Sequence, residues 1–145
     1  MDYSLFRGHD EKSRVTPATC KVETGRTLVE AGLHPATSGG GLSACSEDML
    51  LEALVACAGV TLRAVATAPD IPLRGGTVSA EGDLDFRGML GASREAPVGF
   101  RDIRLRFDLD TDALADKFDS LIKLTERYCV ACQPCGRRPN LRYWH

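Results

Sequence analysis

Six cysteines are the residues of this sequence whose chemistry could define a function. They are Cys20, Cys45, Cys57, Cys129, Cys132 and Cys135. Residues 1–14 are mixed and charged, without the apolar stretch of a secretory signal, so we expect a reducing, cytoplasmic location. Structural disulfides are rare in such a compartment, where cysteines are more often inert, metal-binding or redox-active. The function of the chain depends on which of these three descriptions applies.

The last three cysteines form a Cys-x₂-Cys-x₂-Cys motif, which is one way to begin a zinc or iron–sulfur site. They are Cys129, Cys132 and Cys135. A complete site needs four ligands, and zinc sites normally bring two close pairs. His145 lies ten residues past Cys135, so no fourth ligand follows at local spacing. We therefore expect no resident metal or other cofactor, although a small metal-binding module built on these three cysteines stays open as an alternative.

Cys57 lies in a segment that predicts a helix over residues 46–66. Ser46 is of a type that favours helix starts, and Glu47 follows in the first turn, where the helix dipole favours negative charge. Residues 53–60 are all apolar or glycine, so the helix has no polar face there. One small sheet could not cover such a helix, and we expect a second subunit to complete its burial. By its burial tendency alone, Cys57 would be a small hydrophobic residue of the core.

Short strands are predicted near both ends of the chain. Two are expected around residues 18–23 and 27–31, and a further one at 141–144. A glycine-rich loop over residues 34–44 separates the first pair from the helix that holds Cys57. This loop has no Lys-Ser or Lys-Thr ending, so it is expected to be flexible rather than to bind phosphate.

The middle of the chain predicts a strand pair followed by a second helix. Residues 78–86 and 103–109 alternate between apolar and polar positions, which is typical of an antiparallel ribbon with one solvated face. Opposite charges on those solvated faces suit cross-strand pairing. An amphipathic helix is expected to begin at Asp110 or Thr111 and to end near Cys129. This order of strands and segregated helices predicts an α+β fold rather than a doubly wound sheet.

Length and composition narrow the remaining possibilities. The 145 residues suit one domain, 1–145, with a polar lead-in at 1–14 and an atypical tail at 130–145 that contains cysteine, proline and arginine. The 18 basic and 20 acidic residues leave a net charge of −2, which argues against nucleic-acid binding. The longest apolar run, 53–60, is far shorter than the roughly 20 residues of a membrane helix. We expect neither nucleic acid nor a membrane as a partner.

Two segments together resemble the OsmC/Ohr family of thiol peroxidases. In the first, residues 46–62, an acidic residue opens a helix and a cysteine follows ten positions later, here Glu47 and Cys57. The second, residues 124–130, is similar to the second cysteine motif of the family and holds Cys129. The resemblance covers about residues 20–135, with the same order of elements and a similar glycine-rich approach to the first helix.

The resemblance implies a fold and a reaction. The fold would be the α+β fold of the OsmC-like proteins, with antiparallel sheets wrapped around long central helices in an intertwined homodimer. The reaction would be the reduction of organic hydroperoxides, an antioxidant activity typical of stress responses. Cys57 would be the peroxidatic cysteine, which becomes a sulfenic acid, and Cys129 the resolving cysteine, which forms a disulfide with it. An external dithiol would restore both thiols.

A reactive thiol must ionise near neutral pH, so something must offset the cost of a negative charge in an apolar helix. The resemblance implies an arginine that Glu47 orients. Arg26 is the best candidate, because other members carry an arginine at the start of the second strand. Arg63 is a poorer one, since it lies six residues after Cys57 and about 120° away around the helix.

Three questions stay open at the level of sequence. The apolar surroundings of Cys57 favour organic hydroperoxides over hydrogen peroxide. A noncatalytic protein of the same fold, which binds an apolar ligand at the dimer interface, is an alternative. The tail departs from the family pattern at Cys132 and Cys135, which could be additional resolving partners but which we expect to be incidental.

Overall fold

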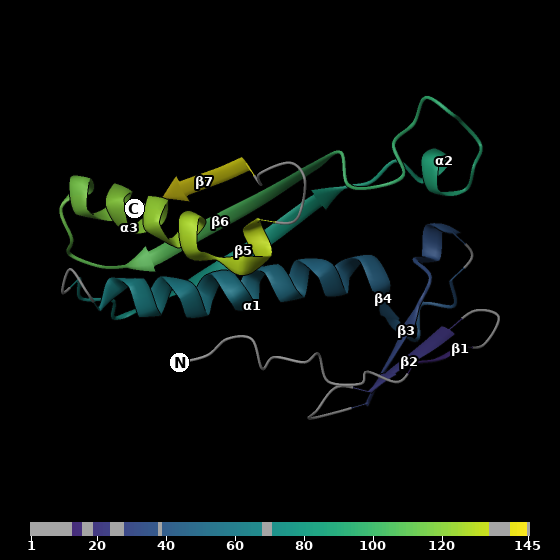
Figure 1. Ribbon diagram of the computed structural model, residues 1–145, viewed down its shortest axis with the longest axis horizontal. Coiled ribbons are helices and arrows are strands. Elements are labelled where there is room, and N and C mark those ends of the chain that lie inside the picture. Colours follow the sequence, from purple (N-terminus) through teal and green to yellow (C-terminus); the bar gives the residue numbers. More distant parts are fainter. Residues whose placement is uncertain are drawn as a thin grey trace, which may run out of the picture. The chain divides into compact units, whose positions relative to one another are not determined.

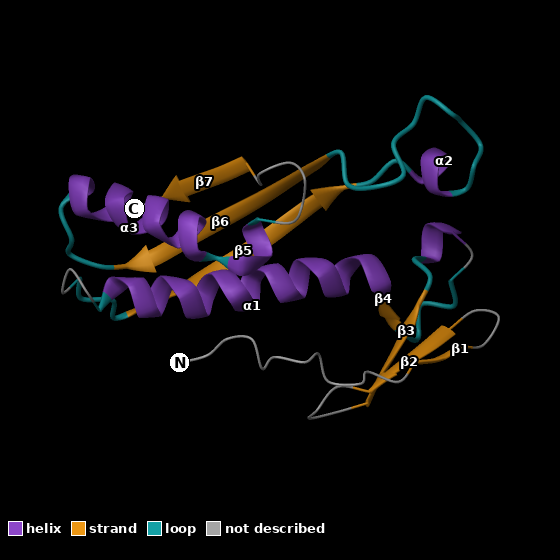
Figure 2. Ribbon diagram, viewed as in Figure 1, coloured by secondary structure: helices purple, strands orange, loops and turns teal. Residues whose placement is uncertain are grey.

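The computed structural model describes residues 13–15, 19–23, 28–37, 39–67, 71–133 and 140–144 (Figure 1). They belong to two compact units, Met1–Met49 and Leu50–His145. Helices are combined with two sheets whose strand pairs are mostly antiparallel (Figure 2), which confirms the predicted α+β class. That the two units form a single domain stays a prediction.

A four-stranded sheet makes up most of the described part of the first unit. Its strands, in spatial order, are β1 (Ser13–Val15), β2 (Thr19–Glu23), β3 (Leu28–Gly32) and β4 (Ala44–Cys45). Strands β2 and β3 match the pair predicted around residues 18–23 and 27–31. Strands β1 to β3 are antiparallel, whereas β4 runs parallel to β3. The loop between β3 and β4 contains a 3₁₀ turn, η2 (Pro35–Thr37).

The second unit contains a three-stranded sheet. Its strands are β5 (Gly75–Asp83), β6 (Asp102–Asp110) and β7 (Asn140–Trp144). β5 and β6 form the predicted antiparallel ribbon, in which Val78 pairs with Phe107 and Ala80 with Leu105. β7 confirms the predicted last strand but pairs with β6 in parallel. The expectation of purely antiparallel sheets is therefore wrong at β4 and at β7.

Charged side chains pair across the ribbon on its solvated face, as the alternation predicts. Arg104 of β6 donates to Asp83 and Glu81 of β5 at 2.6 Å and 3.4 Å, and to Asp102 of its own strand at 3.2 Å. Because Asp83 and Glu81 are exposed, their pairs with Arg104 each contribute little to stability. Their main effect is to favour the register that places apolar partners on the opposite face.

Helix α1 (Ser46–Ala66) has the predicted length but buries only one stripe of its surface. Leu54, Ala58, Leu62 and Ala66 are buried at four-residue spacing, whereas Val60 is 72% exposed. Over an 18-residue window the mean hydropathy reaches 1.8, while only 22% of that window is buried. By length and composition alone the helix could cross a membrane. Within the described residues an apolar side of this helix is exposed, and that a second subunit covers it stays a prediction.

The second long helix, α3 (Ala115–Tyr128), ends where it was predicted to end but begins later. Leu114 occupies the N-cap position and makes no side-chain cap hydrogen bond. Thr111, a predicted cap, instead donates its hydroxyl to the Pro72 carbonyl at 2.8 Å and accepts from the Ala113 N–H at 3.2 Å. The hydroxyl stabilises the loop between β6 and α3, so the first helical turn forms only after it.

The short helices of the second unit lie next to the ribbon and next to α3. They are α2 (Phe86–Met89), which the sequence analysis did not predict, and the 3₁₀ turn η3 (Val130–Cys132). Asp85 caps α2 by accepting from the Arg87 N–H at 3.2 Å. This local hydrogen bond turns the chain sharply after β5.

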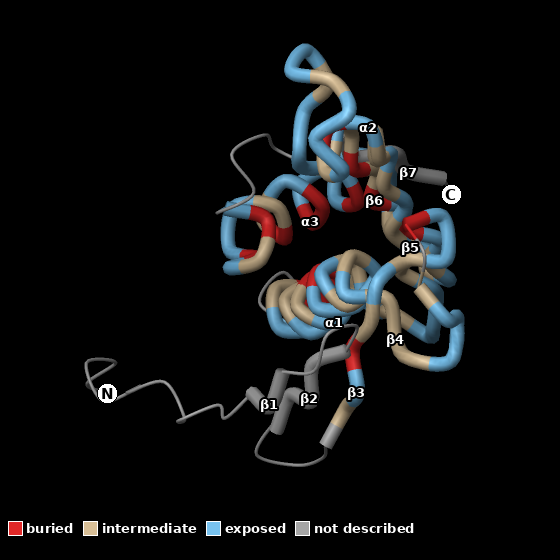
Figure 3. Tube along the Cα trace, turned by 90° about the vertical axis from the view of Figure 1, so that its right-hand side faces the viewer, coloured by how far each residue is buried: buried red, intermediate tan, exposed pale blue. Residues whose placement is uncertain are grey.

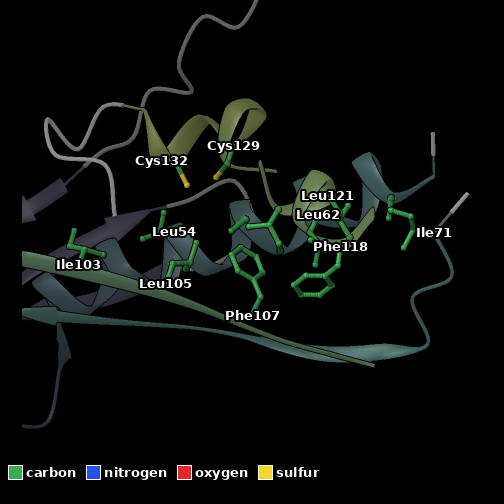
Figure 4. Packing of buried hydrophobic residues seen from close by; sticks show 13 residues of the cluster. Leu54, Leu62, Ile71, Ile103, Leu105, Phe107, Phe118, Leu121, Cys129 and Cys132 are labelled. Atoms are coloured by element: carbon green, nitrogen blue, oxygen red, sulfur yellow. The ribbon is translucent and has the colours of Figure 1, made fainter. Parts of the chain in front are cut away.

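The core of the second unit lies between α1, α3 and the apolar face of β6. The buried residues of these three elements face one another (Figure 3), and their side chains interlock in one cluster (Figure 4). Its largest fully buried members are Phe107 and Phe118, with Leu105, Leu121 and Ile122 around them. The C-terminal end of this cluster contains Cys129 and Cys132. The same packing that stabilises the unit therefore positions two of its thiols.

Replacing Phe118 tests this core. Phe118→Ala removes a side chain that is 1% exposed, and the resulting cavity should lower the free energy of unfolding by about 3–5 kcal/mol. Urea denaturation at one fixed protein concentration measures the change. Asp119→Ala, at the neighbouring exposed position of α3, should shift it by less than about 0.5 kcal/mol. Similar effects of the two substitutions would contradict this description of the core.

Candidate thiol redox site

Cys57 and Cys129 lie within hydrogen-bond reach of each other. Cys57 is half-buried near the middle of α1, and Cys129 is fully buried at the end of α3. The Cys129 thiol donates to the Cys57 sulfur. No disulfide joins the cysteines whose side chains the structure describes, so both are present as thiols. The structure thus brings together two cysteines that are 72 positions apart in the chain.

The end of α3 explains the position of Cys129. Its N–H donates to the Thr125 carbonyl at 2.8 Å, as in a continuing helix, but its backbone is extended, with φ −70° and ψ 112°. The chain therefore leaves α3 at Cys129 and turns into η3. Gln133 donates its side-chain amide to the carbonyls of Glu126 at 3.0 Å and Arg127 at 3.4 Å, which ties the end of this turn to the last turn of α3.

Four hydrogen-bond donors surround the Cys57 sulfur. They are the N–H groups of Ala131 and Val130, the Cys129 thiol and the Thr61 hydroxyl. Thr61 follows Cys57 by four residues and so lies on the same face of α1. Burial raises the pKa of Cys57, but the donors outweigh it and the net pKa is lower than that of an ordinary thiol. The surroundings favour the thiolate, which is the nucleophilic form.

Cys129 has the opposite tendency. Burial raises the pKa of Cys129, and its hydrogen bond to Cys57 adds to the increase. A hydrogen bond from Cys132 acts in the other direction without reversing the net shift. The surroundings therefore favour the ionised form of Cys57, as a nucleophile requires, and the protonated form of Cys129.

Glu47, the predicted helix-opening acid, lies in the first turn of α1 and accepts hydrogen bonds from two neighbours. Cys45 Sγ donates to Glu47 Oε2 at 2.9 Å, and Ser46 Oγ donates to the same oxygen at 3.1 Å. The Cys45 thiol is the main cause of a lowered Glu47 pKa. Burial first, and the Glu47 carboxylate second, raise the pKa of Cys45. The sequence analysis had expected Glu47 to orient an arginine and did not anticipate these partners.

The predicted arginine, Arg26, lies outside the described residues, and its role stays a prediction. Arg63, the poorer candidate, is exposed and donates to the Leu73 carbonyl at 3.1 Å, next to the start of β5. Among the described residues, the strongest effects that lower the pKa of Cys57 come from uncharged donors and not from an arginine.

Sequence reasoning missed most of these donors. Backbone N–H groups have no side-chain signature, so Val130 and Ala131 could not be identified as donors from their types. Thr61 did leave a signal, because it is a polar residue four positions after Cys57 in an otherwise apolar helix.

The candidate metal site is only partly described. In the described part of the chain, no group of three or more His, Cys, Asp or Glu side chains is arranged to hold a metal ion. Cys135 and His145, the other residues considered for such a site, lie outside it.

Solved structures resemble this chain over most of its length. An OsmC-like protein from Mycoplasma pneumoniae superposes with a TM-score of 0.78 at 14% identity, covering 97% of this chain and 98% of that one. The organic hydroperoxide resistance protein OhrB of Bacillus subtilis gives 0.68 at 18% identity, with 92% and 95% covered. An organic hydroperoxide resistance protein OsmC from Legionella pneumophila gives 0.66 at 16% identity, with 91% of each chain covered.

These identities are low, so the similarity concerns the fold. No curated protein matches the sequence significantly. The family model of the OsmC-like proteins matches residues 39–143, which is well over half of the chain and includes both Cys57 and Cys129. The chain therefore belongs to the OsmC/Ohr family of OsmC-like proteins.

Proposed function

We propose that this protein is a cysteine-dependent peroxidase that reduces organic hydroperoxides. One observation carries the proposal: the Cys57 sulfur receives hydrogen bonds from two backbone N–H groups and from the thiol of Cys129. The same sulfur is thus favoured as a thiolate and placed beside a second thiol. The names of the similar Bacillus subtilis and Legionella pneumophila proteins, which refer to organic hydroperoxide resistance, support this choice of substrate.

In the first step, the Cys57 thiolate attacks one peroxide oxygen and the O–O bond breaks. The released alkoxide takes up a proton and leaves as an alcohol, and Cys57 becomes a sulfenic acid. In the second step, the Cys129 sulfur loses its proton and attacks the Cys57 sulfur, so that an S–S bond forms and water leaves. An external dithiol then reduces this disulfide through two thiol–disulfide exchanges.

An apolar groove lined by residues on either side of Cys57 in the sequence supports a preference for organic hydroperoxides. It is shallow, with a volume of about 570 Å³, and α1 and β5 supply its lining. The lining residues are Val55, Ala56, Gly59, Val60, Arg63 and Val78. A hydrocarbon group would gain from leaving water on such a surface, whereas hydrogen peroxide has no apolar part to bury.

A second copy of the chain is the proposed cover for this face of α1. The groove is too shallow to enclose a substrate, and its apolar lining includes the exposed Val60. A homodimer that packs here would bury them and deepen the groove, with the sheets wrapped around the paired central helices. Because a dithiol must reach the disulfide, we also propose a cytoplasmic location, where the activity would be an antioxidant defence in stress responses.

Turnover with two peroxides tests the activity. In the presence of dithiothreitol, the protein should consume cumene hydroperoxide faster than hydrogen peroxide, because only the former can use the apolar groove. Cys57→Ser should lose both activities, since a hydroxyl does not replace the thiolate. Cys20→Ser, which changes a cysteine that has no role in the proposed reaction, should retain them. Equal activity of Cys57→Ser and the unsubstituted protein would instead favour a noncatalytic protein that binds an apolar ligand.

Replacing Cys129 separates the two steps of the reaction. Cys129→Ser should still react with peroxide but should accumulate sulfenic acid on Cys57, because the resolving thiol is missing. Trapping with dimedone followed by intact mass measurement detects the sulfenic acid. The unsubstituted protein should give little adduct, since the disulfide forms first. Rapid disulfide formation on Cys57 in Cys129→Ser would show that another cysteine resolves it.

Replacing Thr61 tests the cause of the lowered Cys57 pKa. The thiolate fraction falls as pH falls through this pKa, so the alkylation rate of Cys57 against pH reports its value. Thr61→Val keeps the side-chain shape but removes a donor, and the midpoint should move to higher pH. Thr67→Val, whose hydroxyl donates instead to the Ala64 carbonyl, should leave the midpoint in place. A midpoint that does not respond to Thr61→Val would remove the hydroxyl from the list of stabilising donors.

A further inference from the structure

A third thiol adjoins the pair in the proposed reaction. Cys132 is 4% exposed and donates a hydrogen bond to the sulfur of Cys129, which in turn donates to Cys57. The sulfurs of Cys129 and Cys132 point toward one another in Figure 4. The three thiols, named here the thiol chain, are therefore connected in the order Cys132, Cys129, Cys57. The proposed reaction uses Cys129 and Cys57 and does not involve Cys132.

The backbone places Cys132 where a disulfide to Cys129 can close. Cys129 immediately precedes η3, and Cys132 is its last residue. The Cys132 N–H donates to the Cys129 carbonyl at 3.2 Å, so the two residues span one closed turn. Residues three apart in a 3₁₀ turn eclipse each other and are separated by a rise of about 6 Å. This separation falls inside the roughly 4.4–6.8 Å between Cα atoms that disulfides bridge.

We propose that Cys132 is a second resolving cysteine, which takes over the disulfide from Cys57 and ends in a Cys129–Cys132 disulfide. The inference rests on the proposed function, because it begins from the Cys57–Cys129 disulfide. The thiol chain is its geometric basis, since the attacking sulfur already contacts the sulfur that it must attack.

The transfer is a balanced exchange that needs no further oxidant. Cys132 loses its proton to water and its sulfur attacks the sulfur of Cys129. The Cys129–Cys132 bond forms, the Cys57–Cys129 bond breaks, and the electron pair leaves on Cys57. Thiol–disulfide exchange favours the leaving sulfur with the lower pKa. The N–H groups of Val130 and Ala131, which lower the pKa of Cys57, thus make Cys57 the better leaving group.

The transfer would have a consequence for turnover. Cys57 would return to the thiolate while the oxidising equivalent stays on Cys129 and Cys132. The site could then react with a second peroxide before any external dithiol arrives. The external dithiol would act on the Cys129–Cys132 disulfide rather than on one that involves Cys57.

Peptide mapping can follow the transfer in the full chain. Trypsin leaves Cys45 and Cys57 in the peptide 27–63, where fragmentation of the linked peptides tells them apart, and places both Cys129 and Cys132 in the peptide 128–137. The variant Cys135→Ser removes the remaining cysteine of the second peptide, so any disulfide inside that peptide must join Cys129 to Cys132. The reduced protein receives one equivalent of cumene hydroperoxide without dithiol and is quenched with acid and alkylating reagent at increasing times.

We expect the linkage between the two peptides to appear first and then to decline as the disulfide inside peptide 128–137 rises to become the main product. With excess peroxide, Cys135→Ser and the unsubstituted protein should each consume a second equivalent. Adding Cys132→Ser should abolish both the disulfide inside peptide 128–137 and the consumption of a second equivalent of peroxide. The linked peptides should then be the final product. Cys132→Ala should do the same, which separates loss of the thiol from any effect of a buried hydroxyl.

The outcomes separate the two proposals. If the linked peptides form and persist with Cys132 present, the transfer is wrong and the peroxidase proposal stands. If no peroxide is consumed and no disulfide forms, both are wrong. Because the mapping follows a protein that retains Cys132, a folding defect in the Cys132 variants cannot produce either result.

Discussion

The proposed chemistry depends on hydrogen bonds that end on one sulfur atom. A thiolate inside an apolar helix is unfavourable unless donors replace the water that it loses. At Cys57, the described donors are uncharged, and three of them come from the short segment Cys129–Ala131. The contact of this segment with α1 is therefore what turns a small core residue into a nucleophile.

The hydrophobic core holds that contact in place. Phe118, Leu121 and Thr125 are buried along the side of α3 that leads to Cys129. The Thr125 hydroxyl donates to the Leu121 carbonyl at 2.8 Å, so it is buried on this face with its hydrogen bond satisfied. Gln133 then joins the end of η3 to α3. Packing and chemistry are thus linked, since a shift of α3 would move the donors of Cys57.

The sequence predicted features that depend on local pattern and missed those that depend on distant partners. The pattern predicted the bounds of α1 and, to within one residue, those of β6, whereas β5 begins and ends three residues earlier than predicted. The parallel pairing of β4 and β7 was missed, because strand partners are chosen by the whole sheet. The start of α3 was misplaced because Thr111 has a capping side chain that bonds to Pro72 instead. Family resemblance selected Cys57 and Cys129, whereas the backbone donors had no residue type to reveal them.

The cysteines described by the structure differ in how readily they would react with an electrophile from solvent. Cys129 and Cys132 are shielded by their depth, and Cys45 is held protonated by burial and by its hydrogen bond to the Glu47 carboxylate. Cys57 alone among the four combines partial access with stabilising donors. A reagent from solvent should therefore label Cys57 selectively among these four cysteines. Burial shields Cys129 and Cys132 from such a reagent, but the two thiols still contact each other.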